Sequence, residues 1–385
     1  MSDPSQAADR GEHQVSPLEL FFDLVFVFAI TQVTKLLTNT PTWDGILRGA
    51  LVLAAVWWAW IGYTWLTSAT EVDEGGVRLA MLAATTAMLG VALAAPAAFG
   101  ADAVFFGAAY LVVSIIHLVL STAVGRDPDR RSALVRFAPT SLIAAILVFL
   151  AGFPGGDVQL AVWVMALAIG YGGPTVIGLG RGWHVAPAHF AERYGLVILI
   201  ALGESIIAIG AGAGLDLTPG VVVGATLGAV VVSALWWLYF DVAAIFARRR
   251  LMEATGVARA RLARDAYTYL HLPMVAGIVL FAFGLKTTLH HVHAHLQTVP
   301  AVALCGGVAL YLLAHIGFLY RATGYIFRRL TIGAAVLLAW IPVASAISAI
   351  AALGFVSIVS ALVVAYEAIR HRGSRSEVRR SERTS

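Results

Sequence analysis

The chain has 385 residues, of which 59% are hydrophobic and only 12% are charged. Soluble domains carry about 25% charged residues, so this composition, with a mean hydropathy of +0.83, excludes a soluble globular protein. The net charge is +4, but the basic residues stand in short groups between apolar runs, which indicates membrane topology rather than nucleic-acid binding. Cys305 is the single cysteine, which excludes a disulfide within the chain and a thiolate metal site.

Long apolar runs predict about twelve transmembrane helices, because a helix needs ~20 mostly apolar residues to span a bilayer. The polar tail 1–16 contains no cleavable signal, so the first run is expected to be retained. The expected spans are 17–38, 44–68, 77–99, 103–124, 133–152, 158–180, 190–213, 218–247, 265–287, 299–320, 325–343 and 346–369. The predicted fold is an all-α polytopic transmembrane helix bundle.

The basic residues predict the orientation of these spans. If the N-terminus is cytoplasmic, 23 of the 26 lysines and arginines fall in segments that face the cytoplasm, and only Lys35, Arg48 and Lys286 do not. This matches the positive-inside rule. We therefore expect an even number of spans, both termini in the cytoplasm and an inner (plasma) membrane location.

The two halves of the chain resemble each other, which predicts two parallel six-helix repeats, 17–180 and 181–369. Each half has an acidic residue and a later polar patch in its first span, an aromatic group in its second and a histidine in its fourth. The paired features are Glu19 with 29–32 and Glu192 with 201–205, residues 57–60 and 236–239, and His117 and His315.

Two polar segments lie outside the expected spans. The basic tail 370–385 is expected to be disordered, with weak attraction to anionic lipid. A connection on the outer side carries His290, His291, His293 and His295, which are weak candidates for a zinc or nickel site. A solvated loop is the alternative, since no acidic or thiolate ligand is near.

Several ionisable residues are expected close to the cytoplasmic ends of the first, seventh, eighth and ninth spans. A carboxylate at bilayer depth costs about 2.5–3.5 kcal/mol, so such groups pair with each other or serve a function. Arg193 and His271 are the expected partners of the carboxylates. This predicted inner cluster consists of Glu19, Asp23, Glu192, Arg193, Asp241 and His271. Two readings stay open: a structural network that fixes helix packing, and a proton or cation path.

Glu204 is the one carboxylate expected deep in the membrane, about 21 Å along its helix from residue 190. His117, His315, Gln32 and Thr31 are candidate hydrogen-bond partners for it. Intramembrane carboxylates mark ion or substrate pathways often enough to be treated as functional by default, so Glu204 is a candidate path residue, with a packing role as the alternative.

No enzyme signature is present. The chain has no His-Glu-x-x-His, no Gly-x-Ser-x-Gly and no Walker loop. We expect no catalytic residues, no cofactor and no pocket that brings a nucleophile and a base together.

The motif from Pro17 to Gln32 (PLELFFDLVFVFAITQ), together with 192–196 and 202–205, resembles the bacterial low-temperature-requirement A family. The resemblance covers nearly the whole chain. It implies a bacterial membrane protein connected with growth in the cold, and implies no particular mechanism.

The first span is also similar to the first helix of potassium channels that carry a Phe-Ser-Asp motif. In that family the first helix of each six-helix repeat lines the pore, and two chains supply four repeats. Phe22 stands here in place of the serine, and Pro17 in place of an expected arginine. Ion selectivity is therefore not implied by this similarity.

The sequence thus predicts an ion channel or a proton- or cation-coupled transporter. Its partners would be the lipid bilayer and an inorganic cation or proton, with a homodimer as an open possibility and no nucleic acid. The alternative is a membrane sensor or scaffold in cold or stress adaptation that transports nothing.

Overall fold

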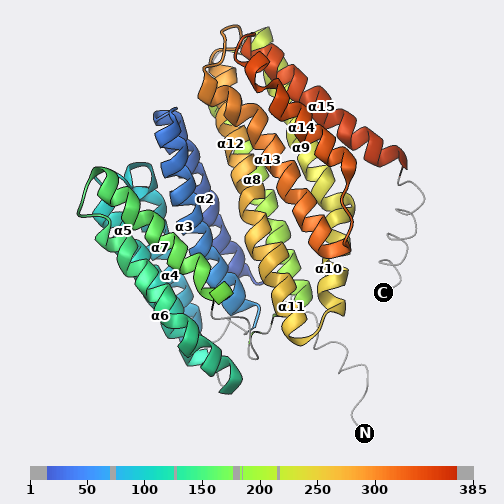
Figure 1. Ribbon diagram of the computed structural model, residues 1–385. Coiled ribbons are helices and arrows are strands. Elements are labelled where there is room, and N and C mark those ends of the chain that lie inside the picture. The colour runs from blue at the N-terminus through green and yellow to red at the C-terminus, as the bar shows by residue number, and fades with distance from the viewer. Residues whose placement is uncertain are drawn as a thin grey trace. The chain divides into compact units, whose positions relative to one another are not determined.

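The computed structural model of the chain describes residues 15–69, 75–124, 128–176, 183, 185–214 and 217–370 (Figure 1). The predicted N-terminal tail, apart from Val15 and Ser16, and the basic tail after Arg370 lie outside the described residues. Within the described part of the chain every regular element is a helix.

The helices follow the predicted apolar runs. They are α2 (Pro17–Asn39), α3 (Trp43–Thr67), α4 (Gly75–Ala94) with the short η1 (Ala95–Ala97), α5 (Ala103–Val124), α6 (Pro128–Leu150), α7 (Gly156–Val176), α8 (Pro187–Ala213), α9 (Pro219–Leu238), η2 (Tyr239–Ala243), α10 (Ala244–Glu253), α11 (Gly256–Leu262), η3 (Ala263–Tyr269), α12 (Leu270–His290), α13 (Thr298–Thr323), α14 (Arg328–Ala344) and α15 (Ala349–Arg370). The π-helical segments η2 and η3 join their neighbours into continuous helical rods.

Eleven rods in the described residues are long and apolar enough to cross a membrane. The prediction of a polytopic helical membrane bundle is therefore confirmed. The run predicted at 325–343 also forms a helix, but α14 has only 17 residues and is shorter than the eleven spans. A short turn separates it from α15, which begins at Ala349.

The chain forms two compact units, which are described separately. The first comprises Met1–Val197 and Arg250–Leu272, and the second Ile198–Arg249 and Pro273–Ser385. The chain changes unit three times, inside α8, inside α10 and near the start of α12. The division into two sequence repeats stays a prediction.

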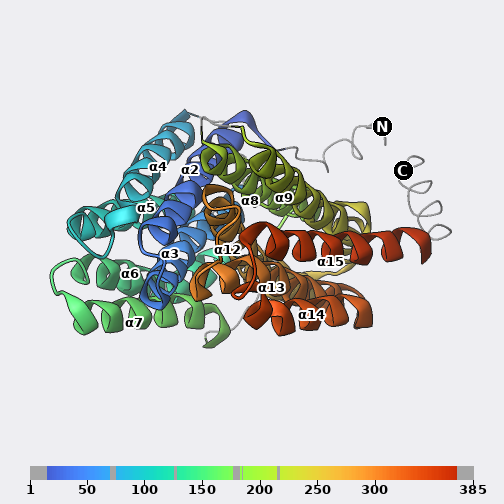
Figure 2. The same ribbon diagram turned by 90° about the horizontal axis from the view of Figure 1, so that it is seen from above.

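In the first unit, α3 has the most enclosed position. It contacts α2, α5 and α7, while α4 packs between α2 and α5, and α6 packs between α5 and α7 (Figure 2). The large side chains of Trp57, Trp60 and Tyr63 are completely buried on α3. The aromatic run that the sequence contains in its second span therefore forms the core of this unit.

In the second unit, small residues allow close helix packing. A Cβ atom added to Gly277 of α12 would lie 2.5 Å from the carbonyl oxygen of Gly307 on α13. Gly224 and Gly228 of α9 face α12, where Leu289 and Leu285 fill the space. Transmembrane helices associate through such close backbone and side-chain contacts, because lipid gives no hydrophobic force between them.

Candidate functional site: a buried charge cluster

The first side of the candidate site is the start of α2. The hydroxyl of Ser16 accepts a hydrogen bond from the Glu19 amide (3.3 Å), and the Glu19 carboxylate accepts one from the Ser16 amide (2.9 Å). This reciprocal capping box fixes the helix start at Pro17. Asp23 follows Glu19 by four residues, so both carboxylates lie on one face of the helix.

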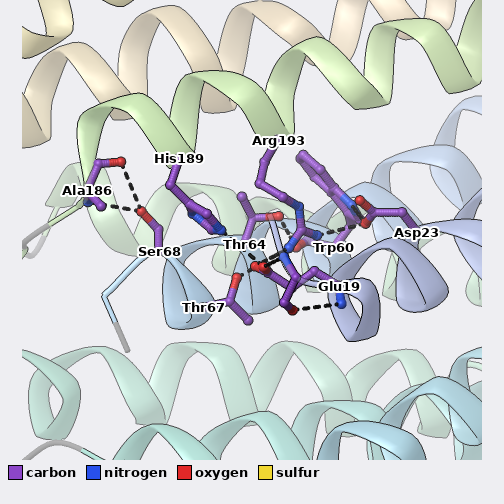
Figure 3. A network of polar contacts seen from close by, with 10 residues as sticks. Glu19, Asp23, Trp60, Thr64, Thr67, Ser68, Ala186, His189 and Arg193 are labelled. Atoms are coloured by element: carbon purple, nitrogen blue, oxygen red, sulfur yellow. Dashed lines mark hydrogen bonds and ion pairs between the residues drawn. The ribbon is translucent and has the colours of Figure 1, made fainter. Parts of the chain in front are cut away.

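The second side is the start of α8. The Ala186 amide donates to both the carbonyl oxygen and the hydroxyl of Ser68 (3.1 Å each), so the beginning of α8 is tied to the end of α3. His189 and Arg193 are four residues apart on α8 and share a face. Figure 3 shows this face turned toward Glu19 and Asp23.

Arg193 bridges the two carboxylates of α2. Its Nη1 donates to Glu19 Oε1 (2.6 Å) and its Nη2 to Asp23 Oδ1 (2.7 Å). His189 Nε2 lies 3.1 Å from Glu19 Oε2. The side chains of Glu19, Asp23, Arg193 and His189 are only 2, 3, 1 and 3% exposed. These four residues are called the charge cluster below.

Residues of α3 complete the surroundings of the charge cluster. Trp60 Nε1 donates to Asp23 Oδ1 (2.9 Å), and the Thr67 hydroxyl accepts from Arg193 Nη1 (3.3 Å). The guanidinium carbon of Arg193 lies 5.7 Å from the centre of the Trp60 ring. Tyr194 packs edge-on against the same ring (5.1 Å). The rings of Trp60 and Tyr194 thus pack beside the charge cluster.

The charge cluster has a formal charge of −1 when His189 is neutral. Two carboxylates carry two negative charges and one guanidinium carries one positive charge. The Nε2–H of a neutral His189 donates a hydrogen bond to the Glu19 carboxylate. Neither Asp23 Oδ2 nor His189 Nδ1 has a hydrogen-bond partner among the described residues. Because a buried N–H without an acceptor is costly, Nδ1 is best assigned as the unprotonated nitrogen. The cluster can therefore accept one more proton and reach neutrality.

Two predicted members of the inner cluster lie elsewhere. Glu192 is exposed on α8, because consecutive helical residues point about 100° apart and Arg193 occupies the inward position. His271 is completely buried, but its Nδ1 lies 3.1 Å from the Ala266 carbonyl oxygen, and its ring stacks on Tyr267. The expected pairing of His271 with a carboxylate stays a prediction.

The remaining acidic and amide candidates are buried in different helices. Gln32 lies on the inner face of α2 in the first unit. Asp241 lies within η2 and Glu204 within α8, both in the second unit. Glu204 is 2% exposed. Gln32 and His117 belong to the first unit and Glu204 to the second, so the predicted approach of Glu204 to them stays a prediction.

The two predicted mid-span histidines have different neighbours. His117 of α5 faces Gly62 of α3, and its Nε2 lies 3.3 Å from the Ser121 hydroxyl. Both residues line a cavity of the first unit, so a hydroxyl and an imidazole do meet at a pocket, which we did not expect. His315 of α13 is buried and stacks on Tyr311.

The loop histidines give no metal site. His290, His291, His293 and His295 are all exposed, and the closest ring contact between them joins His290 and His291 at 6.4 Å. Nowhere in the described residues do three or more histidine, cysteine, aspartate or glutamate side chains gather closely enough to hold an ion.

Sequence reasoning missed His189 and Trp60 as members of the site. His189 precedes Arg193 by four residues, so its place on the same helix face was available as a signal. Trp60 was noticed only as part of an aromatic group. Its role depends on which helix lies beside α2, which no local pattern specifies.

We expect loss of the α2 cap to destabilise the protein. Replacement Ser16→Ala removes the acceptor of the Glu19 amide and should cost about 1 kcal/mol, measured as a lower midpoint of thermal unfolding in detergent. Ser132→Ala is the control, because Ser132 is exposed and accepts only from Arg136 (3.1 Å). Equal midpoints for the two variants would contradict the role of the cap.

Many apolar helices around a buried set of bonded charges define a multi-pass membrane protein. A family model described as the bacterial low temperature requirement A protein (LtrA) matches residues 14–365. The chain belongs to this family, as the motif from Pro17 to Gln32 predicted.

One curated relative extends the comparison. An uncharacterized protein of Rhizobium meliloti (strain 1021) is 30% identical over 313 residues, which cover 76% of this chain and 74% of the relative. No solved structure matches the chain.

Proposed function

We propose that the protein is a transporter of the bacterial inner membrane that moves protons, alone or coupled to a small inorganic cation. The charge cluster is the proposed place where the proton is held. The observation that carries this proposal is the combination of complete burial with a formal charge of −1, which one proton neutralises.

Energetic reasoning favours a use for the cluster over a purely stabilising role. Each charged residue at bilayer depth costs about 2.5–3.5 kcal/mol on insertion scales. Replacing a buried ion pair by well-packed apolar residues is often neutral or even stabilising. A membrane protein therefore gains little stability from Glu19, Asp23, His189 and Arg193, and proton transfer gives a reason to keep them.

The geometry favours a proton over a larger cation at this position. Arg193 already occupies the space between the two carboxylates, at 2.6 and 2.7 Å. A potassium or sodium ion would have to displace the guanidinium, whereas a proton needs only the Asp23 Oδ2 atom, which has no hydrogen-bond partner among the described residues. Protonation of Asp23 would weaken its bond to Arg193 and allow α2 and α8 to separate.

The proposal includes an orientation of the charge cluster in the membrane. The distribution of basic residues puts both termini in the cytoplasm, so the charge cluster lies near the cytoplasmic ends of α2 and α8. Glu19 pairs with His189 and Arg193, and Asp23 with Arg193. Along both helices the pairs follow in the same order, so α2 and α8 run parallel and begin on the same side of the membrane. In this proposal the protein catalyses no reaction. We also propose that α2 lines the transport path.

Proton flux in proteoliposomes tests the proposal. Purified protein is reconstituted with an entrapped pH dye, a pH gradient is imposed, and valinomycin with potassium holds the membrane potential at zero. Wild type should dissipate the gradient faster than empty vesicles, and Asp23→Asn should lower the rate at least tenfold. Glu192→Gln is the matched control, since it removes an exposed carboxylate next to Arg193 on the same helix.

The alternative is a sensor or scaffold in which the same ion pairs only lock the helices. Its supporting observation is that Arg193 pairs with both carboxylates at once. Parallel flux assays with potassium and sodium gradients separate the two functions. If wild type moves neither protons, potassium nor sodium above the level of empty vesicles, the transport proposal is wrong and the alternative is favoured.

A further inference from the structure

The first unit contains a cavity on the side of α3 away from the charge cluster. Its volume is about 90 Å³, and side chains of α3, α5 and α6 form most of its wall. The end of α7 contributes Pro174, and η3 contributes Thr268 and Tyr269. No function proposed above uses this space.

The size of the cavity limits what it can hold. A water needs roughly 10–15 Å³ of such volume and fills ~30 Å³ in the liquid, so the space matches roughly six to nine waters. A single organic molecule of about ten non-hydrogen atoms fits the same space.

The wall of the cavity is mainly aromatic. Trp58, Trp65, Phe137, Trp183 and Tyr269 all line it. Trp65 and Phe137 each meet Trp183 edge-on, at 5.7 and 5.6 Å. Aromatic rings prefer such edge-on or offset contacts with further rings, so the wall favours a flat, aromatic guest over a branched aliphatic one.

The charged residues of the wall are all positive. Arg130 and Arg264 line the cavity, and its described lining contains neither aspartate nor glutamate. Arg130 Nη1 donates to the Ala69 carbonyl oxygen (3.1 Å), which fixes its side chain across the end of α3. Arg264 Nε donates to Asp265 (2.7 Å), and its Nη1 approaches the Pro174 carbonyl oxygen (3.4 Å). Asp265 reduces the positive charge but does not line the space.

Each guanidinium offers five N–H donors in a planar fork that matches a carboxylate. In the same lining, the Ser121 hydroxyl and His117 Nε2 lie 3.3 Å apart and supply a second polar position. The lining thus combines two guanidinium groups, several aromatic rings and a small polar pair.

We propose that this cavity binds a small aromatic monocarboxylate, with the carboxylate at Arg130 and Arg264 and the ring between the aromatic side chains. The proposal does not rest on proton transport, because binding at equilibrium is measured without any flux.

Fluorine NMR of 4-fluorobenzoate with the full-length protein in uncharged detergent tests the proposal. This probe has about ten non-hydrogen atoms, which is the size that fits the cavity. We expect saturable broadening with wild type. The double variant Arg130→Gln, Arg264→Gln should raise the Kd at least tenfold. Arg136→Gln is the matched control on α6, because Arg136 is exposed and does not line the cavity.

Two further measurements separate a specific site from general adsorption. The neutral 4-fluorobenzamide should bind at least tenfold more weakly than 4-fluorobenzoate. Ala59→Leu fills part of the cavity and should abolish binding while the protein stays monodisperse. Absence of saturable binding to wild type, equal binding of the amide, or an equal effect of Arg136→Gln would each overturn the proposal.

Discussion

Replacement of Arg193 by methionine is expected to destabilise the protein by about 3–5 kcal/mol. Arg193 is 1% exposed and bridges Glu19 and Asp23, so its removal leaves two carboxylates buried without a cation. The loss should appear as a large drop in the midpoint of unfolding in detergent and in the yield of monodisperse protein.

A second set of variants tests the cause of this loss. Addition of Glu19→Gln and Asp23→Asn to Arg193→Met removes the unpaired charges and should recover more than half of the lost free energy of unfolding. Glu192→Gln should change stability by less than ~0.5 kcal/mol, as exposed sites usually do. If Arg193→Met unfolds at the wild-type midpoint, the ion pairs do not hold α8 to α2.

The exchange of Gly307 for alanine should separate α12 from α13. The added Cβ atom would lie 2.6 Å from the Gly277 carbonyl oxygen and 2.6 Å from the Phe281 amide nitrogen. Both are backbone atoms that cannot turn aside, so one helix must shift. We expect a loss of at least ~2 kcal/mol, within the range for overpacked cores, measured by chemical unfolding in detergent.

The neighbouring residue provides the control. Gly306 has no atom closer than 3.7 Å to an added Cβ atom. Since alanine favours a helix over glycine by about 1 kcal/mol, Gly306→Ala should leave stability unchanged or raise it. Similar losses for both variants would show that helix propensity, and not the contact with α12, decides the outcome.

The number and place of the helices could be predicted because each apolar run is long and flanked by polar turns. The pairing of Glu19 and Asp23 with Arg193 could also be foreseen, since charges in a membrane need partners. Their positions on α2 and α8 are about 170 residues apart, and a helical spacing tells which face a side chain occupies but not which helix lies opposite.

The limit of the prediction has the same physical origin. Glu192 was grouped with Arg193 because both lie near the expected cytoplasmic end of the helix, yet a helix turns adjacent residues to different sides, and Glu192 is exposed. The cavity beside α3 could not be foreseen at all. Its wall combines Trp58, Phe137 and Arg264, which only the packing of separate helices brings together.

Helix α8 belongs to both compact units, and this has a mechanical consequence. The stretch that carries Arg193 and the stretch that carries Glu204 form one unbroken rod, Pro187–Ala213. Eleven residues at 1.5 Å each put the two side chains about 16 Å apart along its axis. If Arg193 is released from Glu19 and Asp23 and α8 then moves along its axis as one rigid helix, Glu204 moves by the same distance.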